Sequence, residues 1–294
     1  AFESADRYIT PTNPDDSGDV TYAEWTPTAG LVYNLAPTLN LYASYGRAFE
    51  TPTGIELAYR PDGGSGTNFA LQPAISHQFE IGAKWLAGAA TRVNVALFDI
   101  RTEGEIVIAR NLGGRSSFVN AGDTSRLGAE LLLDSELGAG FSTRVALTWL
   151  NARFDSAFTS CAPLAAFCNP ATGVNTAIVP DGNRVPGVPS ASVYAELGYR
   201  DAHALSWTGV AGALELVANS RIEVDDYNSA AAAGYAIANV WIGLEQQVER
   251  WTLRQFARVN NLFDRATIGA VVVGDANGRY YAPAPTRNIV AGVS

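Results

Sequence analysis

The most constraining feature of this chain is an alternation of apolar and polar residues that recurs in segments of about ten residues. In residues 76–86, for example, the apolar Phe79 and Ile81 are at odd-numbered positions, whereas the charged Glu80 and Lys84 are at even-numbered positions. Successive side chains of a strand point to opposite faces, so a period of two predicts strands. About eleven such segments, separated by turn-forming residues, predict an all-β fold built as an antiparallel meander.

The connections between these segments differ in length in a regular way. Short turns are predicted at residues 36–37, 87–90, 138–140, 201–204 and 249–251. Long connections alternate with them, at residues 50–75, 102–117, 155–189, 221–234 and 265–286. In an antiparallel meander this alternation places every long connection at one end of the sheet, which is the asymmetry of an outer-membrane barrel. Within the last connection, Pro283 and Pro285 lack backbone donors, so residues 280–286 are expected to lie outside any sheet.

Alternation by itself fits two architectures. In a soluble sandwich the apolar face is the core, whereas in a membrane barrel it contacts lipid and the charged face lines the lumen. The sequence has no uninterrupted apolar run of the length that a transmembrane helix needs, but a closed barrel also satisfies every backbone group in lipid. A strand of ten residues rises ~33 Å and, tilted by ~45°, covers the apolar band of an outer membrane. Strand length, strand number and one-sided connections favour a transmembrane β-barrel.

The net charge and the composition limit the classes of partner that this chain is expected to bind. The net charge is −9 and the isoelectric point is about 4.8, which argues against a nucleic-acid partner, since that requires a basic footprint. The apolar content of 47% with 17% charged residues is that of a folded chain.

Two cysteines, Cys161 and Cys168, lie close together in a polar connection. This setting favours a local disulfide over two unrelated buried thiols and predicts an oxidising compartment. A metal site would need further ligands, and the connection contains no histidine.

No catalytic pattern is present, so neither an enzyme nor a cofactor is expected. The serines and aspartates have no histidine at a useful spacing, and the glycine-rich residues 62–66 are not followed by the lysine of a phosphate loop. Asp225 and Asp226 could bind Ca²⁺, but the interpretation preferred here is a pair of solvated loop carboxylates.

Five stretches in order resemble the TonB-dependent outer-membrane receptors. They are LNLYASYGRAFETPT (39–53), LQPAISHQFEIGAK (71–84), NAGDTSRLGAELLL (120–133), RVPGVP (184–189) and NNLFD with GRYYAPAPTRN in residues 260–294. Ala74 replaces the glutamate usual in the family. The family's last strand runs further and ends on an aromatic residue, so a clipped end is expected after Ser294.

The resemblance implies that residues 1–294 are the C-terminal half of a 22-stranded barrel in the outer membrane, without its plug domain. It implies contact with lipid, import of ferric-siderophore complexes and coupling to TonB through the N-terminal part. Haem, cobalamin or a saccharide are alternative cargoes, and haem is weakened because the long connections contain no histidine. A small passive porin and a soluble β-sandwich binding protein are alternatives of other classes.

Ligand contacts are expected in the long connections and on the wall below them. Arginine forks and aromatic rings suit an anionic, aromatic ferric chelate, although each residue could instead serve ordinary loop packing. Two adjacent tyrosines of the last connection also suit anchoring at the level of the lipid headgroups. The candidates are Arg47, Tyr59, Arg60, Arg110, Arg115, Arg184, Tyr227, Arg279, Tyr280 and Tyr281.

Overall fold

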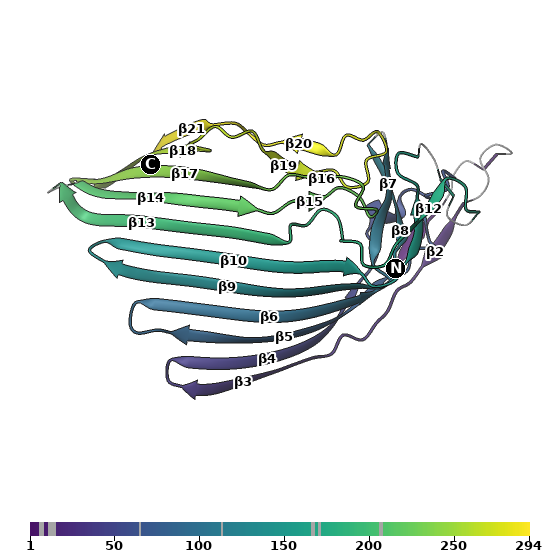
Figure 1. Ribbon diagram of the computed structural model, residues 1–294, viewed down its shortest axis with the longest axis horizontal. Helices are drawn as coiled ribbons and strands as arrows, with labels where there is room; N and C mark the ends of the chain where they lie inside the picture. Colours follow the sequence, from purple (N-terminus) through teal and green to yellow (C-terminus); the bar gives the residue numbers. More distant parts are fainter. Residues whose placement is uncertain are drawn as a thin grey trace.

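Eleven strands form one antiparallel sheet in which chain neighbours are also neighbours in space (Figure 1). The computed structural model describes residues 1–5, 9–10, 16–64, 66–112, 114–165, 168–169, 172–205 and 208–294. The strands are β3 (Thr28–Ala36), β4 (Leu39–Glu50), β5 (Ala74–Leu86), β6 (Thr91–Glu103), β9 (Thr124–Gly138), β10 (Phe141–Phe154), β13 (Ala191–Leu205), β14 (Thr208–Asn219), β17 (Tyr235–Val248), β18 (Trp251–Asn260) and β21 (Asn288–Val293). The predicted antiparallel meander is confirmed, with β3 and β21 as its edge strands.

One face of the sheet is apolar and exposed. The register places the apolar positions directly opposite one another, as with Ile81 and Leu97 or Leu131 and Leu147. Ile81 remains 51% exposed and Leu97 50% exposed, and the same holds along most of the sheet. Water-soluble monomers rarely expose so large a contiguous apolar surface. We call this the outward face.

The opposite face carries charged ladders. Arg144 lies opposite Asp134 on one side and Glu196 on the other, and its Nε donates to Asp134 Oδ1 at 2.6 Å. Together with Arg92, these three side chains line a hollow of about 420 Å³. Further along, the two terminal nitrogens of Arg258 donate to the two carboxylate oxygens of Glu215 at 2.6 and 2.5 Å. Because charged residues line the hollow, this is the inward face.

The two ends of the sheet are different, as predicted (Figure 1). One end has tight turns, such as residues 87–90 between β5 and β6. The other end gathers the long connections, which contain the short helix α1 (Gly54–Leu57) and small two-stranded sheets. In the connections, these pair β7 (Ile106–Leu112) with β8 (Arg115–Asn120), β11 (Phe158–Cys161) with β12 (Thr176–Val179), β15 (Ile222–Glu223) with β16 (Ala231–Ala232), and β19 (Ile268–Val271) with β20 (Tyr281–Pro283). Before β3, β1 (Phe2–Ser4) pairs with β2 (Gly18–Val20).

Two local predictions are wrong. The turn predicted at residues 201–204 is strand, since β13 continues through a register shift to Leu205, and residues 206–207 lie outside the described part of the chain. Residues 281–283 form β20, with Pro283 opposite Ile268. A two-stranded ribbon leaves each strand a free edge, where proline loses no ladder hydrogen bond. Within the described ranges, no helix is long and apolar enough to cross a membrane.

Candidate functional site

The long connections pack into a small unit of their own at one end of the sheet. We call this unit the loop cap and define it as the described residues within 104–123, 155–190, 220–234 and 261–287. Val107, Ala121 and Val179 form a buried cluster with Phe154 from the end of β10, and Tyr227 packs against it. Phe154 and Val179 are completely buried. The loop cap therefore has an apolar core separate from the faces of the sheet.

Tyr227 ties one connection to another. Its hydroxyl lies 3.0 Å from the carbonyl oxygens of both Cys161 in β11 and Ala177 in β12. Burial, together with the charges of Asp226 and Asp225, raises the pKa of Tyr227 to about 12, so the hydroxyl remains a donor. Cys161 forms a disulfide with Cys168, which closes the chain just beyond β11.

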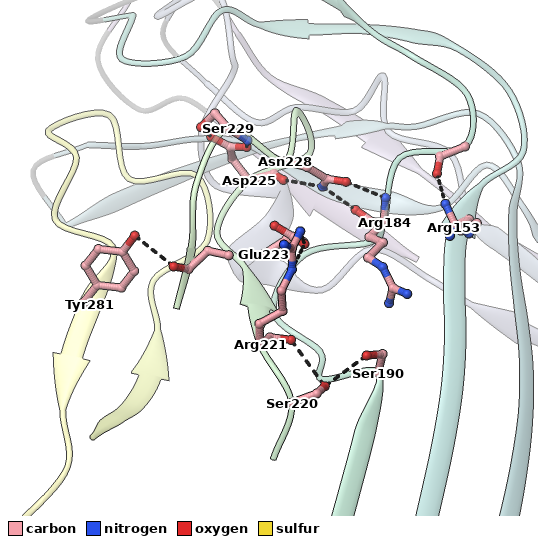
Figure 2. Close-up of polar contacts among 12 residues, drawn as sticks. Arg153, Arg184, Ser190, Ser220, Arg221, Glu223, Asp225, Asn228, Ser229 and Tyr281 are labelled. Carbon is pink, nitrogen blue, oxygen red and sulfur yellow. Dashed lines mark hydrogen bonds and ion pairs between the residues drawn. The ribbon is translucent and has the colours of Figure 1, made fainter. Parts of the chain in front are cut away.

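Asn228 makes a second tie, which Figure 2 shows. Its side-chain oxygen accepts from the Arg184 backbone N–H at 2.8 Å, and its side-chain nitrogen donates to the Arg184 carbonyl at 2.9 Å. The amide of Asn183 also donates to the Asp226 carbonyl at 2.9 Å. Asn228 has a φ of 53°, a left-handed conformation that asparagine tolerates better than most residues. Residues 183–184 are thereby fixed to residues 225–228.

The expectation that Asp225 and Asp226 are solvated is wrong. They are only 6% and 5% exposed, because the connections close over them. Asp225 accepts hydrogen bonds from the backbone N–H of Ser229, at 2.9 Å, and from its hydroxyl. Burial, and then the charges of Asp225 and Glu105, raise the pKa of Asp226 to about 7. Asp226 therefore retains its proton to a higher pH than a solvated aspartate does.

Three predicted ligand candidates meet at a small cavity in the loop cap. Arg110, Tyr227 and Tyr280 line it together with Cys161 and Asp225. Burial raises the pKa of Tyr280 above its ordinary value. The cavity volume is about 30 Å³, and a water molecule needs about 10–15 Å³, so about two waters fit and a ferric chelate does not. These three candidates thus lie side by side in the loop cap.

A second group of candidates is exposed and consists of Tyr59 and Arg60, on the connection between β4 and β5, and Arg115, at the start of β8. The guanidinium of Arg115 lies over the ring of Tyr59, 5.2 Å from its centroid. Arg60 pairs with Asp62 at 2.8 Å, which lowers the pKa of that carboxyl. Thr53 caps α1 through a capping box with Glu56 and sets the path of the chain toward Tyr59.

The remaining candidates are dispersed. Arg47 lies on the outward face of β4 and pairs with Glu24 at 2.8 Å. Arg279 is exposed, and its backbone N–H donates to Asp275 Oδ1 at 3.1 Å. The Tyr281 hydroxyl donates to the Ala231 carbonyl at 3.3 Å (Figure 2). The ten candidates thus occupy several places at the loop end. Hydrogen-bonded turns, such as those at residues 62–64 and 225–229, shape parts of it.

The described residues contain no group of three or more histidine, cysteine, aspartate or glutamate side chains arranged to hold a metal ion. What the loop end offers is a rigid, hydrogen-bonded surface that carries exposed arginine and tyrosine. Such a surface suits recognition of an anionic ligand.

Comparison with known families identifies the class of protein. The model of the TonB-dependent receptor-like β-barrel matches residues 2–262. The chain therefore belongs to this family, whose members are transport receptors of the Gram-negative outer membrane and not enzymes. The apolar outward face, the charged inward face and the one-sided loop cap are the features expected of such a barrel.

Solved structures of similar fold come from the same class. The siderophore receptor PiuA from Acinetobacter baumannii superposes with a TM-score of 0.68 at 19% identity, over 97% of this chain and 38% of that chain. The ferric yersiniabactin uptake receptor FyuA from Yersinia pestis gives 0.67 at 19% identity, over 96% and 39%. The ferric preacinetobactin receptor BauA from Acinetobacter baumannii gives 0.64 at 15% identity, over 95% and 37%. At these identities the likeness shows the fold, and the chain spans well under half the length of each.

Proposed function

We propose that this chain is part of the barrel of a TonB-dependent receptor that imports ferric-siderophore complexes. The family supports the receptor class, and the names of the three structures above supply the siderophore. We also propose that residues 1–294 form part of a larger barrel. The support is that β3 and β21 each have a free edge, and unpaired backbone groups are costly in lipid. Coupling to TonB would then involve a part of the protein outside this sheet.

The observation that carries the ligand proposal is the exposed unit formed by Tyr59 and Arg115. Arg115 has no carboxylate partner among the described residues, and its guanidinium lies over the Tyr59 ring. A planar guanidinium can donate two hydrogen bonds to an anionic chelate, and the ring offers a surface on which an aromatic group of the chelate can stack. Arg60 and Tyr281 are also exposed in the long connections, and we include them in the proposed surface.

This proposal is tested by ligand binding to the intact receptor in detergent. We expect a ferric tris-catecholate to quench the intrinsic fluorescence, and Arg115→Gln to weaken that binding by about tenfold or more, the equivalent of one charge-assisted hydrogen bond. Arg254→Gln is the matched control, because Arg254 pairs with Glu245 on the inward face near the tight turns. Equal binding by both variants would remove Arg115 from the ligand site. Failure of ferric catecholate, hydroxamate and phenolate chelates to bind would overturn the siderophore proposal itself.

A further inference from the structure

A row of polar and basic side chains crosses the outward face just below the loop cap. Each member lies directly opposite the next in the strand register or, for the last pair, across an isolated antiparallel bridge. Directly opposed residues share a face of a sheet, so the whole row points outward. We call it the basic row, and its members in order are Arg47, His77, Arg101, Ser125, Arg153 and Arg184.

The charges along the basic row are not equally compensated. Arg47 and Arg101 each pair with a carboxylate, Glu24 at 2.8 Å and Asp99 at 3.3 Å. Ser125 donates to Asp155 at 2.7 Å. The last two arginines differ from these members, because no carboxylate pairs with either of them within the described ranges.

Arg153 and Arg184 therefore place two positive charges side by side. Arg153 donates only to neutral acceptors, Asn151 Oδ1 at 2.9 Å and the Gly182 carbonyl. Figure 2 shows the Arg184 guanidinium extending away from the hydrogen-bonded network around it. Like charges directly opposite each other on a sheet are unfavourable, and an anion bound between them would remove the repulsion.

The pair is also held in place. Asn228 bonds both backbone groups of Arg184, and the next residue, Val185, donates to the Ala152 carbonyl at 3.2 Å. Arg153 is fixed by its bond to Gly182. The backbone at Arg184 and the side chain of Arg153 are thus already fixed, which lowers the entropy cost of binding a ligand at this place.

The residues around Arg153 and Arg184 indicate what kind of molecule would carry the bound anion. Along β10, away from the loop cap, the outward-facing residues after Arg153 are Asn151 and then Trp149, which is 49% exposed. Leu127, opposite Asn151, is also 49% exposed. A bound molecule thus meets two cations at the rim and an apolar surface directly below them. A lipid has this arrangement, with its phosphate at the headgroup level and its acyl chains beneath.

We propose that Arg153 and Arg184 bind the phosphate of an anionic lipid in the outer leaflet of the membrane. The flat guanidinium groups suit phosphate, to which each can donate two hydrogen bonds. Arg101, two strands from Arg153 and so about 10 Å away, would contact a second anionic group of the same headgroup. The site requires no siderophore and goes beyond the transport function.

The test uses the intact receptor in nanodiscs of phosphatidylcholine, with or without phosphatidylglycerol, and counts the lipids retained in native mass spectrometry. We expect phosphatidylglycerol to be retained in preference to phosphatidylcholine. Arg153→Gln with Arg184→Gln should lower that preference by about 25-fold, since each surface arginine contributes about fivefold. Arg153→Lys with Arg184→Lys keeps both charges and should retain most of it.

Arg254→Gln on the inward face is the matched control and should leave lipid retention unchanged. Equal phosphatidylglycerol retention by the double glutamine variant and the wild type would overturn the proposal. Retention that inorganic phosphate abolishes at millimolar concentration would also overturn it, since the site would then be one for free phosphate. Ferric-chelate binding by the same variants is measured separately, so failure of either proposal leaves the other standing.

Discussion

Asp226 shows at the scale of one residue how the loop cap changes the chemistry of a side chain. An aspartate in a polar connection is ordinarily solvated and ionised, yet this one is 5% exposed and lies near Asp225 and Glu105. Its carbonyl, and not its carboxylate, makes the structural bond to Asn183. The backbone carbonyl of Asp226 thus helps to hold the loop cap together, whereas the charge of its ionised carboxylate opposes closure of the cap.

The stability of the loop cap should consequently depend on pH through Asp226. The carboxyl pKa is raised from 3.8 to about 7 in the folded cap, so the folded form retains a proton that the unfolded form loses between these values. Cap stability should fall as the pH rises from 3.8 to about 7, by at most on the order of 4 kcal/mol. Asp226→Asn should abolish this slope and protect the cap at neutral pH.

Hydrogen exchange of the backbone amides of residues 183–185 and 225–229, corrected for intrinsic rates, measures this effect. The amides of β9, in the sheet, provide the internal reference. An identical pH dependence in wild type and Asp226→Asn would show that other carboxyls govern closure of the cap.

At the scale of elements, the β11–β12 ribbon depends on ties outside its own ladder. The two strands have four residues each, and an isolated ribbon of this length is marginal in water. The disulfide between Cys161 and Cys168 and the hydroxyl of Tyr227 supply the missing constraints. The ribbon is thus stable as part of the loop cap and not by itself.

Removal of the disulfide should loosen this ribbon without unfolding the sheet. For Cys161→Ser with Cys168→Ser we expect a loss of about 2.5 kcal/mol in local stability, from the entropy of a short closed loop. Tyr227→Phe keeps the disulfide and should cost about 1 kcal/mol through its lost hydrogen bond. Limited proteolysis within residues 155–190 reports the loosening, and thermal unfolding of the sheet is the control. If both variants resist protease as well as wild type does, packing alone holds the ribbon.

At the scale of the whole molecule, the two faces of the sheet have different solvents. Leu131 and Leu132 are consecutive residues in the middle of β9, so they test this difference directly. Leu131 lies opposite Val95 and Leu147 on the outward face, whereas Leu132 lies opposite Asn94 and Ala146 on the inward face. Of these two adjacent leucines, Leu131 thus faces lipid and Leu132 faces the lumen.

Arginine at these two positions should have unequal effects. Leu131→Arg places a charge near the middle of the apolar band and should destabilise the folded barrel by about 2–4 kcal/mol. Leu132→Arg places the charge on the inward face beside Asn94 and should cost much less. Urea titration of the receptor refolded into lipid vesicles measures both. Equal destabilisation would contradict the assignment of the outward face to lipid.

The sequence by itself determined the strands, the two faces and the end that carries the long connections, since a period of two and turn-forming residues are local signals. It missed the end of β13 at Leu205 and the strand at residues 281–283, where edge and rim positions relax the usual rules. The family also followed from sequence, through motifs in order.

Only the tertiary structure decided how the connections meet. The hydrogen bonds of Tyr227 and the pairing of Arg153 with Arg184 each join residues about 30 or more positions apart. The burial of Asp225 and Asp226 likewise depends on how the connections pack. No local period encodes such contacts, because they arise when several connections close over a shared apolar core. Residue type and position in a connection define the candidate residues. Whether a given candidate residue is exposed, buried or outward-facing depends on tertiary packing, which the local sequence pattern does not encode.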